Sequence, residues 1–300
     1  MRINPILKKD LKTKLRGWRT MVLLCCYILL LSAILFLYFA GNNMLVPYSS
    51  TAYSPRMAVD AYNLLIVFQF ALLFLAVPAI TATSITSERE RQTLDLMLVT
   101  KTSSVRIVFG KVMVSIAHTM LLLIASMPVL GVVFFFGGVN FADIAKLLLF
   151  YVITSFFVAS CGVFCSTLFK RNIVAIITTY ILLGIITFGP FIVLLISVYV
   201  KELVLRNVGF NPTYGDFLKP LFPSSIFGFT SFYYSGSSMY GYGYSLWGSV
   251  CQEIESQIAR ETGILRFFKP WIVNSVFNIV GSILLILLSA AKLNPVRRKK

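Results

Sequence analysis

Acidic residues are scarce in this sequence, which has 11 Asp and Glu against 27 Lys and Arg, and it contains a single His. Charged residues make up only 13% of the chain, whereas about 25% is typical of soluble globular domains. One His cannot supply a multi-histidine metal site, and neither H-E-x-x-H nor G-x-S-x-G occurs. We therefore expect no catalytic residue on this chain.

A phosphate-binding loop is missing as well. The pattern G-x-x-x-x-G-K-S/T is absent, and Gly110-Lys111 is followed by Val112. Cysteine is sparse, and Cys251 is the single one outside the apolar runs, which leaves no disulfide framework. The other four are Cys25, Cys26, Cys161 and Cys165. We predict no cofactor and no metal on this chain.

Long apolar runs are what the sequence has in abundance. Six of them lack Asp, Glu, Lys and Arg altogether, and each approaches or exceeds the roughly 20 residues that a spanning helix needs. They cover residues 21–40, 61–83, 112–136, 147–169, 173–200 and 271–291. Because they lack the alternation of barrel strands, we predict six transmembrane α-helices. The fold class is all-α, a polytopic membrane protein with one transmembrane domain over residues 1–300.

The Lys and Arg residues divide unevenly between the two ends of these spans. Seven lie in the N-terminal tail, five in the second loop, two in the fourth loop and five in the C-terminal tail. The first and third loops carry one each, and six are spread along the long fifth loop. The positive-inside rule therefore predicts that both termini are cytoplasmic. We expect a multi-pass protein of the cell membrane, taken to be a bacterial plasma membrane.

The net charge of +16 raises the question of a nucleic-acid partner. The basic residues flank membrane spans, where they meet anionic headgroups, and no nucleic-acid-binding motif accompanies them. We predict membrane lipids as partners and no nucleic acid.

Residues 1–20 are predicted to form an amphipathic interfacial helix. Its apolar stripe comprises Leu7, Leu11, Leu15 and Trp18. Lys and Arg occupy the rest of its surface, so the stripe can lie in the acyl boundary with the basic face toward phosphates.

The loop over residues 84–108 is predicted to contain a short amphipathic helix. Ser87 with Glu90 three residues later fits a capping box. Leu94, Met97 and Leu98 would form its apolar face, while charged side chains would cover the other side. A partner protein could dock there.

This loop, with the sequence Ser-Glu-Arg-Glu-Arg-Gln-Thr-Leu-Asp-Leu from Ser87, closely resembles the segment between the second and third spans of ABC-2-type transporter permeases. The opening Asn4-Pro5 with Arg16-Gly-Trp-Arg19 looks like the start of these permeases, and Phe169-Lys170-Arg171 looks like their basic turn after the fourth span. Residues 1–190 match in pattern.

The resemblance implies a permease subunit of an ATP-driven ABC exporter that works by alternating access, with ATP and Mg on a separate ATPase subunit. A second permease copy or a homologous permease would complete the translocation path as a dimer. The segment from Glu88 would be a coupling helix that docks on the ATPase. The docking residues implied are Glu88, Arg89, Glu90, Arg91, Thr93, Leu94 and Asp95.

Residues 201–270 are predicted to be a long extracytoplasmic segment between the fifth and sixth helices. Residues 233–244 form a Tyr, Gly and Ser tract that suggests an irregular loop. Residues 246–267 have near-helical periodicity, which fits either a gate or partner-binding element or a cap on the membrane surface.

Features inside the spans favour packing over chemistry. His118 has no acidic partner in any span, so a proton relay is not expected. Ala159, Gly162 and Ser166 have the spacing of a close helix contact. The alternative function is a secondary transporter or another polytopic membrane protein that works without an ATPase. It is disfavoured because coupling ions usually need charged or polar sites in the spans.

Overall fold

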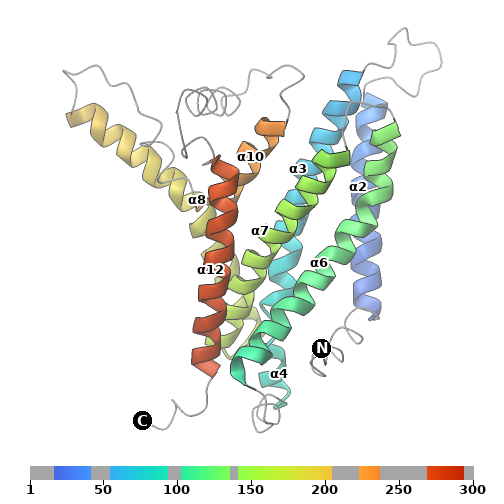
Figure 1. Ribbon diagram of the computed structural model, residues 1–300. Helices are drawn as coiled ribbons and strands as arrows, with labels where there is room; N and C mark the ends of the chain where they lie inside the picture. Colours follow the sequence, from blue (N-terminus) through green and yellow to red (C-terminus); the bar gives the residue numbers. More distant parts are fainter. Residues whose placement is uncertain are drawn as a thin grey trace. The chain divides into compact units, whose positions relative to one another are not determined.

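The structure is a computed structural model that describes residues 17–41, 55–93, 103–135, 141–204, 223–236 and 269–293. All regular structure in these ranges is helical, as predicted (Figure 1). The helices are α2 (Trp18–Gly41), α3 (Pro55–Thr81), α4 (Thr86–Glu90), α6 (Ser104–Phe135), α7 (Phe141–Leu168), α8 (Asn172–Val204), α10 (Ser225–Gly236) and α12 (Pro270–Leu293). Six of them are long and apolar enough to cross a membrane, which confirms the predicted spans.

Several helices extend beyond the apolar runs that predicted them. The third run begins at Val112, but α6 begins at Ser104 and includes Arg106 and Lys111. The fifth run ends at residue 200, but α8 continues to Val204. Hydrophobicity marks only the part of a helix that lies in hydrocarbon, so the charged ends were left out of the prediction.

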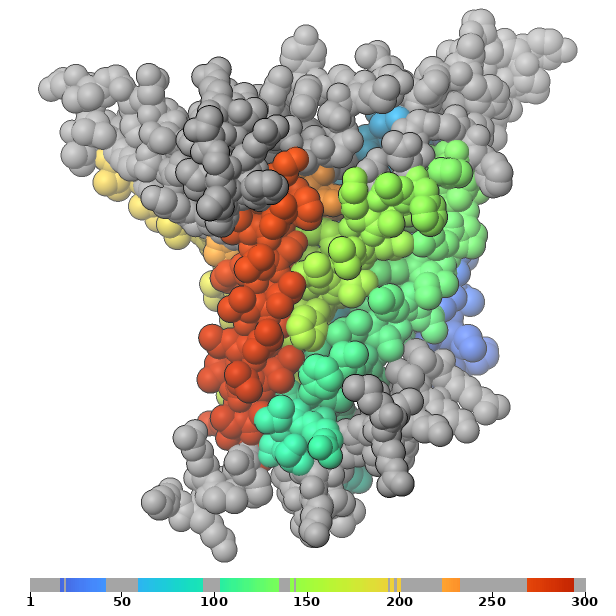
Figure 2. Space-filling view, in the orientation of Figure 1, coloured from blue at the N-terminus to red at the C-terminus, as the bar shows by residue number. Residues whose placement is uncertain are grey.

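The chain falls into two compact units, residues 1–176 with 284–300 and residues 177–283. In the first unit, α3, α6 and α7 contact one another, and α2 contacts α3 and α6. Figure 1 shows these four helices lying side by side, and Figure 2 shows the side chains of α6 and α7 packed together along their length.

Tyr151 of α7 is one of the largest fully buried side chains. Its hydroxyl donates to the carbonyl of Ile66 on α3 at 2.7 Å, and its ring lies 6.2 Å from that of Phe70. Gln69 of α3 donates to the hydroxyl of Ser126 on α6 at 2.8 Å. The core of the first unit is thus apolar packing crossed by a few neutral hydrogen bonds, as expected for helices in a membrane.

The predicted close contact at Gly162 is confirmed. A Cβ atom at Gly162 would lie 2.8 Å from Cβ of Thr81 on α3, too close for any real pair of carbon atoms. Ala159 and Ser166, on the same face, have no exposed surface. Small residues let the α3 and α7 backbones approach here, and dispersion contacts follow from that approach.

The outward faces of the spans carry large apolar side chains. Leu29 and Leu37 of α2 are each 68% exposed, and Leu195 of α8 is 69% exposed. Apolar surface of this extent is rare on soluble monomers and matches the hydrocarbon of a bilayer. These faces lie against lipid or against other membrane helices.

The second unit contains most of α8, all of α10 and the first half of α12. Sequence reasoning missed α10, which lies inside the predicted outer segment and runs through Gly236. The tract from residue 233 is therefore helical in its first four residues, and the prediction of an irregular loop was wrong there. α8 continues through Pro190. The helix predicted over 246–267 lies outside the described residues.

We predict that Gly162→Ala destabilises the protein, because the added methyl group forces α3 and α7 apart. Overpacking of this kind costs about 1–3 kcal/mol. The thermal unfolding midpoint of the purified protein in detergent should fall. The matched control is Gly184→Ala, because nothing lies within 4 Å of a Cβ atom built at Gly184. Equal midpoints for the two variants would contradict the packing described for α7.

Candidate functional site

The short helix α4 lies at one end of the first unit, next to the start of α6 and the turn between α7 and α8 (Figure 1). It follows α3 after a tight turn over residues 82–85. Its five residues, Thr86–Glu90, include two carboxylates and one guanidinium. Most of the site's polar bonds join α4 to the neighbouring spans.

The start of α4 is capped from another helix. The hydroxyl of Ser166 on α7 accepts from the backbone N–H groups of Ile85 at 2.9 Å and Thr86 at 3.0 Å. No side chain of its own caps this helix, which begins one residue before Ser87. The predicted capping box of Ser87 and Glu90 was therefore wrong. The first N–H groups of a helix need acceptors, and a distant serine supplies one here.

The carboxylate of Glu90 binds the start of α8. It accepts from the backbone N–H of Asn172 at 2.9 Å and also from the Asn172 side-chain amide. The amide oxygen of Asn172 in turn accepts from the hydroxyl of Thr86 at 2.5 Å. Asn172 is the first residue of α8, where unpaired N–H groups and the helix dipole both favour an anion. Glu90 therefore fastens α4 to α8.

Arg89 binds the end of α7 in the complementary way. Its guanidinium donates to the backbone carbonyls of Phe169 at 2.7 Å and Thr167 at 3.3 Å. The last carbonyls of a helix have no partner within the helix and carry the negative end of the dipole. The Arg89 cation at this position donates to the unpaired carbonyls and interacts favourably with the negative end of the dipole.

Glu88 forms an ion pair with Lys111 of α6. The lysine side chain is only 3% exposed and the glutamate side chain 18%. A charge taken out of water at this depth depends on its partner, because removal of one member of a buried pair leaves the other uncompensated. Helix α4 is thus joined to α6 by an ion pair, to α7 by capping bonds and to α8 by a carboxylate.

The end of α4 is a sharp turn. Gln92 has a φ of 57°, in the left-handed region. The N–H of Thr93 donates to the carbonyl of Glu88 at 2.9 Å, and the N–H of Gln92 to that of Arg89 at 3.1 Å. These two bonds form a Schellman motif, which ends a helix. The first helix in this loop therefore ends at Glu90, before the predicted apolar face of Leu94, Met97 and Leu98, which lies outside the described residues. No glycine in the sequence signals this stop.

The predicted docking residues separate into two groups. Glu88, Arg89 and Glu90 bind the chain's own spans. Arg91 and Thr93 are exposed. Leu94 and Asp95 lie outside the described residues, as do Leu7, Leu11 and Leu15 of the predicted interfacial helix. Trp18 is the first residue of α2, and its side chain is 82% exposed.

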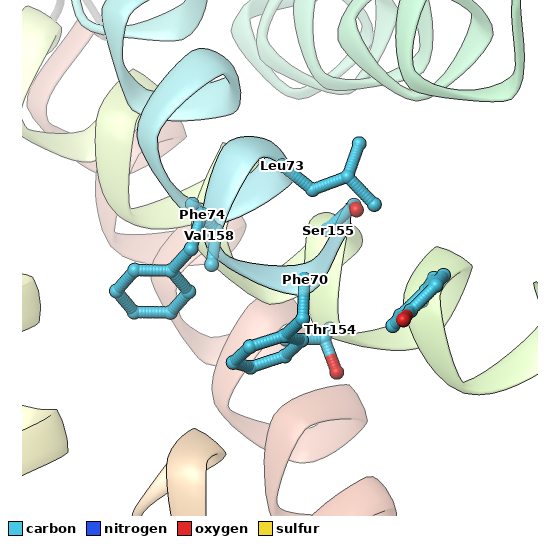
Figure 3. Close-up of a pocket in the computed structure, with 7 residues that line it drawn as sticks. Phe70, Leu73, Phe74, Thr154, Ser155 and Val158 are labelled. Carbon is cyan, nitrogen blue, oxygen red and sulfur yellow. The ribbon is translucent and has the colours of Figure 1, made fainter. Parts of the chain in front are cut away.

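A small pocket lies between α3 and α7, away from α4. Phe70, Leu73 and Phe74 of α3 line it opposite Thr154, Ser155 and Val158 of α7 (Figure 3). Its volume is about 10 Å³, which is room for no more than one water molecule. The pocket is too small for a substrate or a cofactor.

Residues that could hold a metal are not gathered anywhere in the described ranges, where no group of three His, Cys, Asp or Glu occurs. Cys161 and Cys165 are buried in α7, and His118 is buried in α6. The chemistry available at the α4 site is therefore that of charged and neutral hydrogen bonds between helices.

The six apolar helices define a multi-pass membrane protein. The polar helix α4 is bonded to three of them, α6, α7 and α8. The chain matches the family model of the ABC-2 family transporter proteins over residues 40–291, and it belongs to that family. It is thus the membrane component of an ABC transporter, a permease. A search of curated proteins found no match.

We predict that Lys111→Met destabilises the protein, because it leaves the Glu88 carboxylate without its cation. Breaking a buried pair costs about 3 kcal/mol or more. The double variant Glu88→Gln/Lys111→Met should recover most of that loss, since it removes both charges. Thermal unfolding of the two single variants, the double variant and the wild type measures the coupling. Additive losses would show that the two side chains do not stabilise each other.

Proposed function

We propose that this permease is the membrane-spanning half of an ATP-driven exporter whose ATP and Mg sites lie on a separate ATPase subunit. The chain has no phosphate-binding loop, so it depends on a partner for energy. Two permease copies, or this chain and a homologous permease, together form the path. Export is assigned by the resemblance to ABC-2-type exporters.

Both termini and α4 are proposed to face the cytoplasm. The support is the distribution of charge, since nineteen of the 27 Lys and Arg residues fall in the two tails and the second and fourth loops. This orientation puts α4 on the side of the membrane where ATP is available.

The observation that carries the proposal is the attachment of α4 to three spans. Its side chains bind Lys111 of α6, the last carbonyls of α7 and Asn172 of α8. A partner that displaces α4 therefore displaces the ends of these helices with it. Rigid elements joined in this way transmit a small shift at one site into a change between two arrangements of the spans.

The exposed residues after α4 are the proposed contact with the ATPase. Arg91 and Thr93 lie at the outer end of the turn, while the three residues before them hold α4 in place. Glu88, Arg89 and Glu90 thus act as positioning residues, and Arg91 acts as a docking residue. The sequence resemblance had assigned docking to all of them.

We predict that Arg91→Glu weakens co-purification of the ATPase, because a charge reversal in an interface places like charges together or removes a pair. The loss should be about tenfold or more at physiological salt. The measurement is mild-detergent purification of the tagged permease from its native membranes, with quantification of any protein that carries a phosphate-binding loop.

The matched control is Lys146→Glu, another charge reversal of an exposed residue, placed near the opposite end of α7. It should retain the ATPase. A stable wild-type permease with no ATPase partner under several solubilisation conditions would overturn the proposed function and favour the secondary-transporter alternative. Retention of the ATPase by Arg91→Glu would place the docking surface elsewhere.

A further inference from the structure

The second unit contains a chain of neutral hydrogen bonds that joins α8, α10 and α12. The hydroxyl of Ser224, at the start of α10, donates to the carbonyl of Thr187 on α8 at 2.8 Å. The carbonyl of Ser224 accepts from the side-chain amide of Asn274 on α12 at 3.1 Å. The amide oxygen of Asn274 accepts from Asn278 at 3.1 Å. Three helices thus meet through uncharged polar groups.

The contact between α10 and α12 is unusually close. A Cβ atom at Gly228 would lie 2.9 Å from Cβ of Asn274, so only glycine fits there. Ser224, Asn274 and Asn278 have no exposed surface. The amides of α12 are therefore pressed against the first turns of α10 and away from lipid.

Each of the three helices also presents a buried side-chain oxygen with no hydrogen-bond partner among the residues described. These oxygens are Oγ1 of Thr187, Oγ of Ser225 and Oδ1 of Asn278. Thr187 and Ser225 are each 1% exposed, and Asn278 is not exposed at all. Each belongs to a residue in the hydrogen-bonded chain or next to one in sequence. Each of the three helices that this hydrogen-bonded chain joins therefore carries one unsatisfied oxygen, on a residue of the chain or next to one.

None of these polar residues is charged, and they lie between the middle of α8 and the second and third turns of α12. Thr187 is near the middle of α8, and the charged residues of the described part of this unit, Lys201, Glu202 and Lys269, are at helix ends. An unpaired polar group in hydrocarbon has a considerable free-energy cost, so three on hydrogen-bonded helices need a reason. The chemistry present is two hydroxyls, which donate and accept, and one amide oxygen, which accepts.

We propose that Thr187, Ser225 and Asn278 form a binding site for an uncharged hydrogen-bonding group, a hydroxyl or an amide, of an amphiphilic molecule that the permease moves. This proposal rests on the proposed function, because the ligand of the site is the transported molecule. A neutral head group satisfies the three oxygens, and the apolar remainder of the molecule lies against the spans. A charged head group finds no counter-ion there and is excluded.

Matched pyrene probes test the head-group preference. The permease alone, in lipid nanodiscs, is titrated with 4-(1-pyrenyl)butanol, 1-butylpyrene and 4-(1-pyrenyl)butyrate. Saturable energy transfer from Trp271 reports binding once Trp18 and Trp247, the other two tryptophans, are changed to Phe. The butanol should bind about fivefold more tightly than butylpyrene, the difference that one or two net hydrogen bonds supply. The butyrate should bind no better than butylpyrene.

Thr187→Val and Ser225→Ala should each reduce this preference to less than about twofold. Both variants remove a hydroxyl that has no partner in the described structure, so their thermal midpoints should equal or exceed that of the wild type. The matched control is Thr154→Val, which removes a buried, unpartnered hydroxyl from the first unit and should keep the preference.

Three results would overturn the assignment: equal binding of the butanol and butylpyrene by the wild type, an unchanged preference in both variants, or lower midpoints in both, which would make the hydroxyls structural. The probes are bound without ATPase, so a failure here is separate from a failure of the proposed function. If the permease retains its ATPase but shows no head-group preference, only the proposed binding site is overturned. If it shows the preference but no ATPase co-purifies, the binding site stands and the proposed function is overturned.

Discussion

Hydrocarbon offers no hydrogen-bond partners, and the other features of this protein follow from that constraint. Each span must pair its backbone groups internally, which makes helices the structure of choice. Four serines of the spans obey the same rule by bonding to carbonyls of their own helix. Ser115 donates to Lys111, Ser160 to Phe156, Ser275 to Trp271 and Ser282 to Asn278. Such bonds let a span carry hydroxyls without a partner helix.

At helix ends, backbone groups have no partner within their own helix and need one from elsewhere. Three helix ends meet around α4. They are the starts of α4 and α8, with unpaired N–H groups, and the end of α7, with unpaired carbonyls. Ser166 of α7 accepts from the first N–H groups of α4, while Glu90 and Arg89 of α4 bind the first N–H of α8 and the last carbonyls of α7. Because α8 continues into the second unit of the chain, the attachment at Asn172 is on a helix common to both.

The spans could be predicted from sequence because hydrophobicity is a local property and each run stands alone. The ends could not. The cap of α4 is Ser166, about eighty positions away, and no local pattern signals it. The stop at Gln92 uses a left-handed residue other than glycine, so the usual signal was absent. The carboxylate that suggested a capping box, Glu90, is used by α8. Resemblance singled out this polar loop as a coupling region, but it could not tell that Glu88, Arg89 and Glu90 bind the chain's own helices.

Helix α10 illustrates a second limit of sequence reasoning. Its composition, with serine, glycine and aromatic residues, is typical of an irregular loop, and its apolar side chains Phe227 and Phe229 became informative only once they were found buried. The close approach at Gly228 depends on a residue of another helix, Asn274, and is invisible to any pattern within α10.

The single hydroxyl of Ser166 that accepts two N–H groups of the α4 turn has a consequence for modular engineering. Residues 86–90 are not an independently folded segment that can be moved between family members by exchanging one loop. Their conformation is encoded partly by α7 and α8, through Ser166 and Asn172. A chimera that transplants this loop must carry the turn between those helices with it, as one discontinuous module.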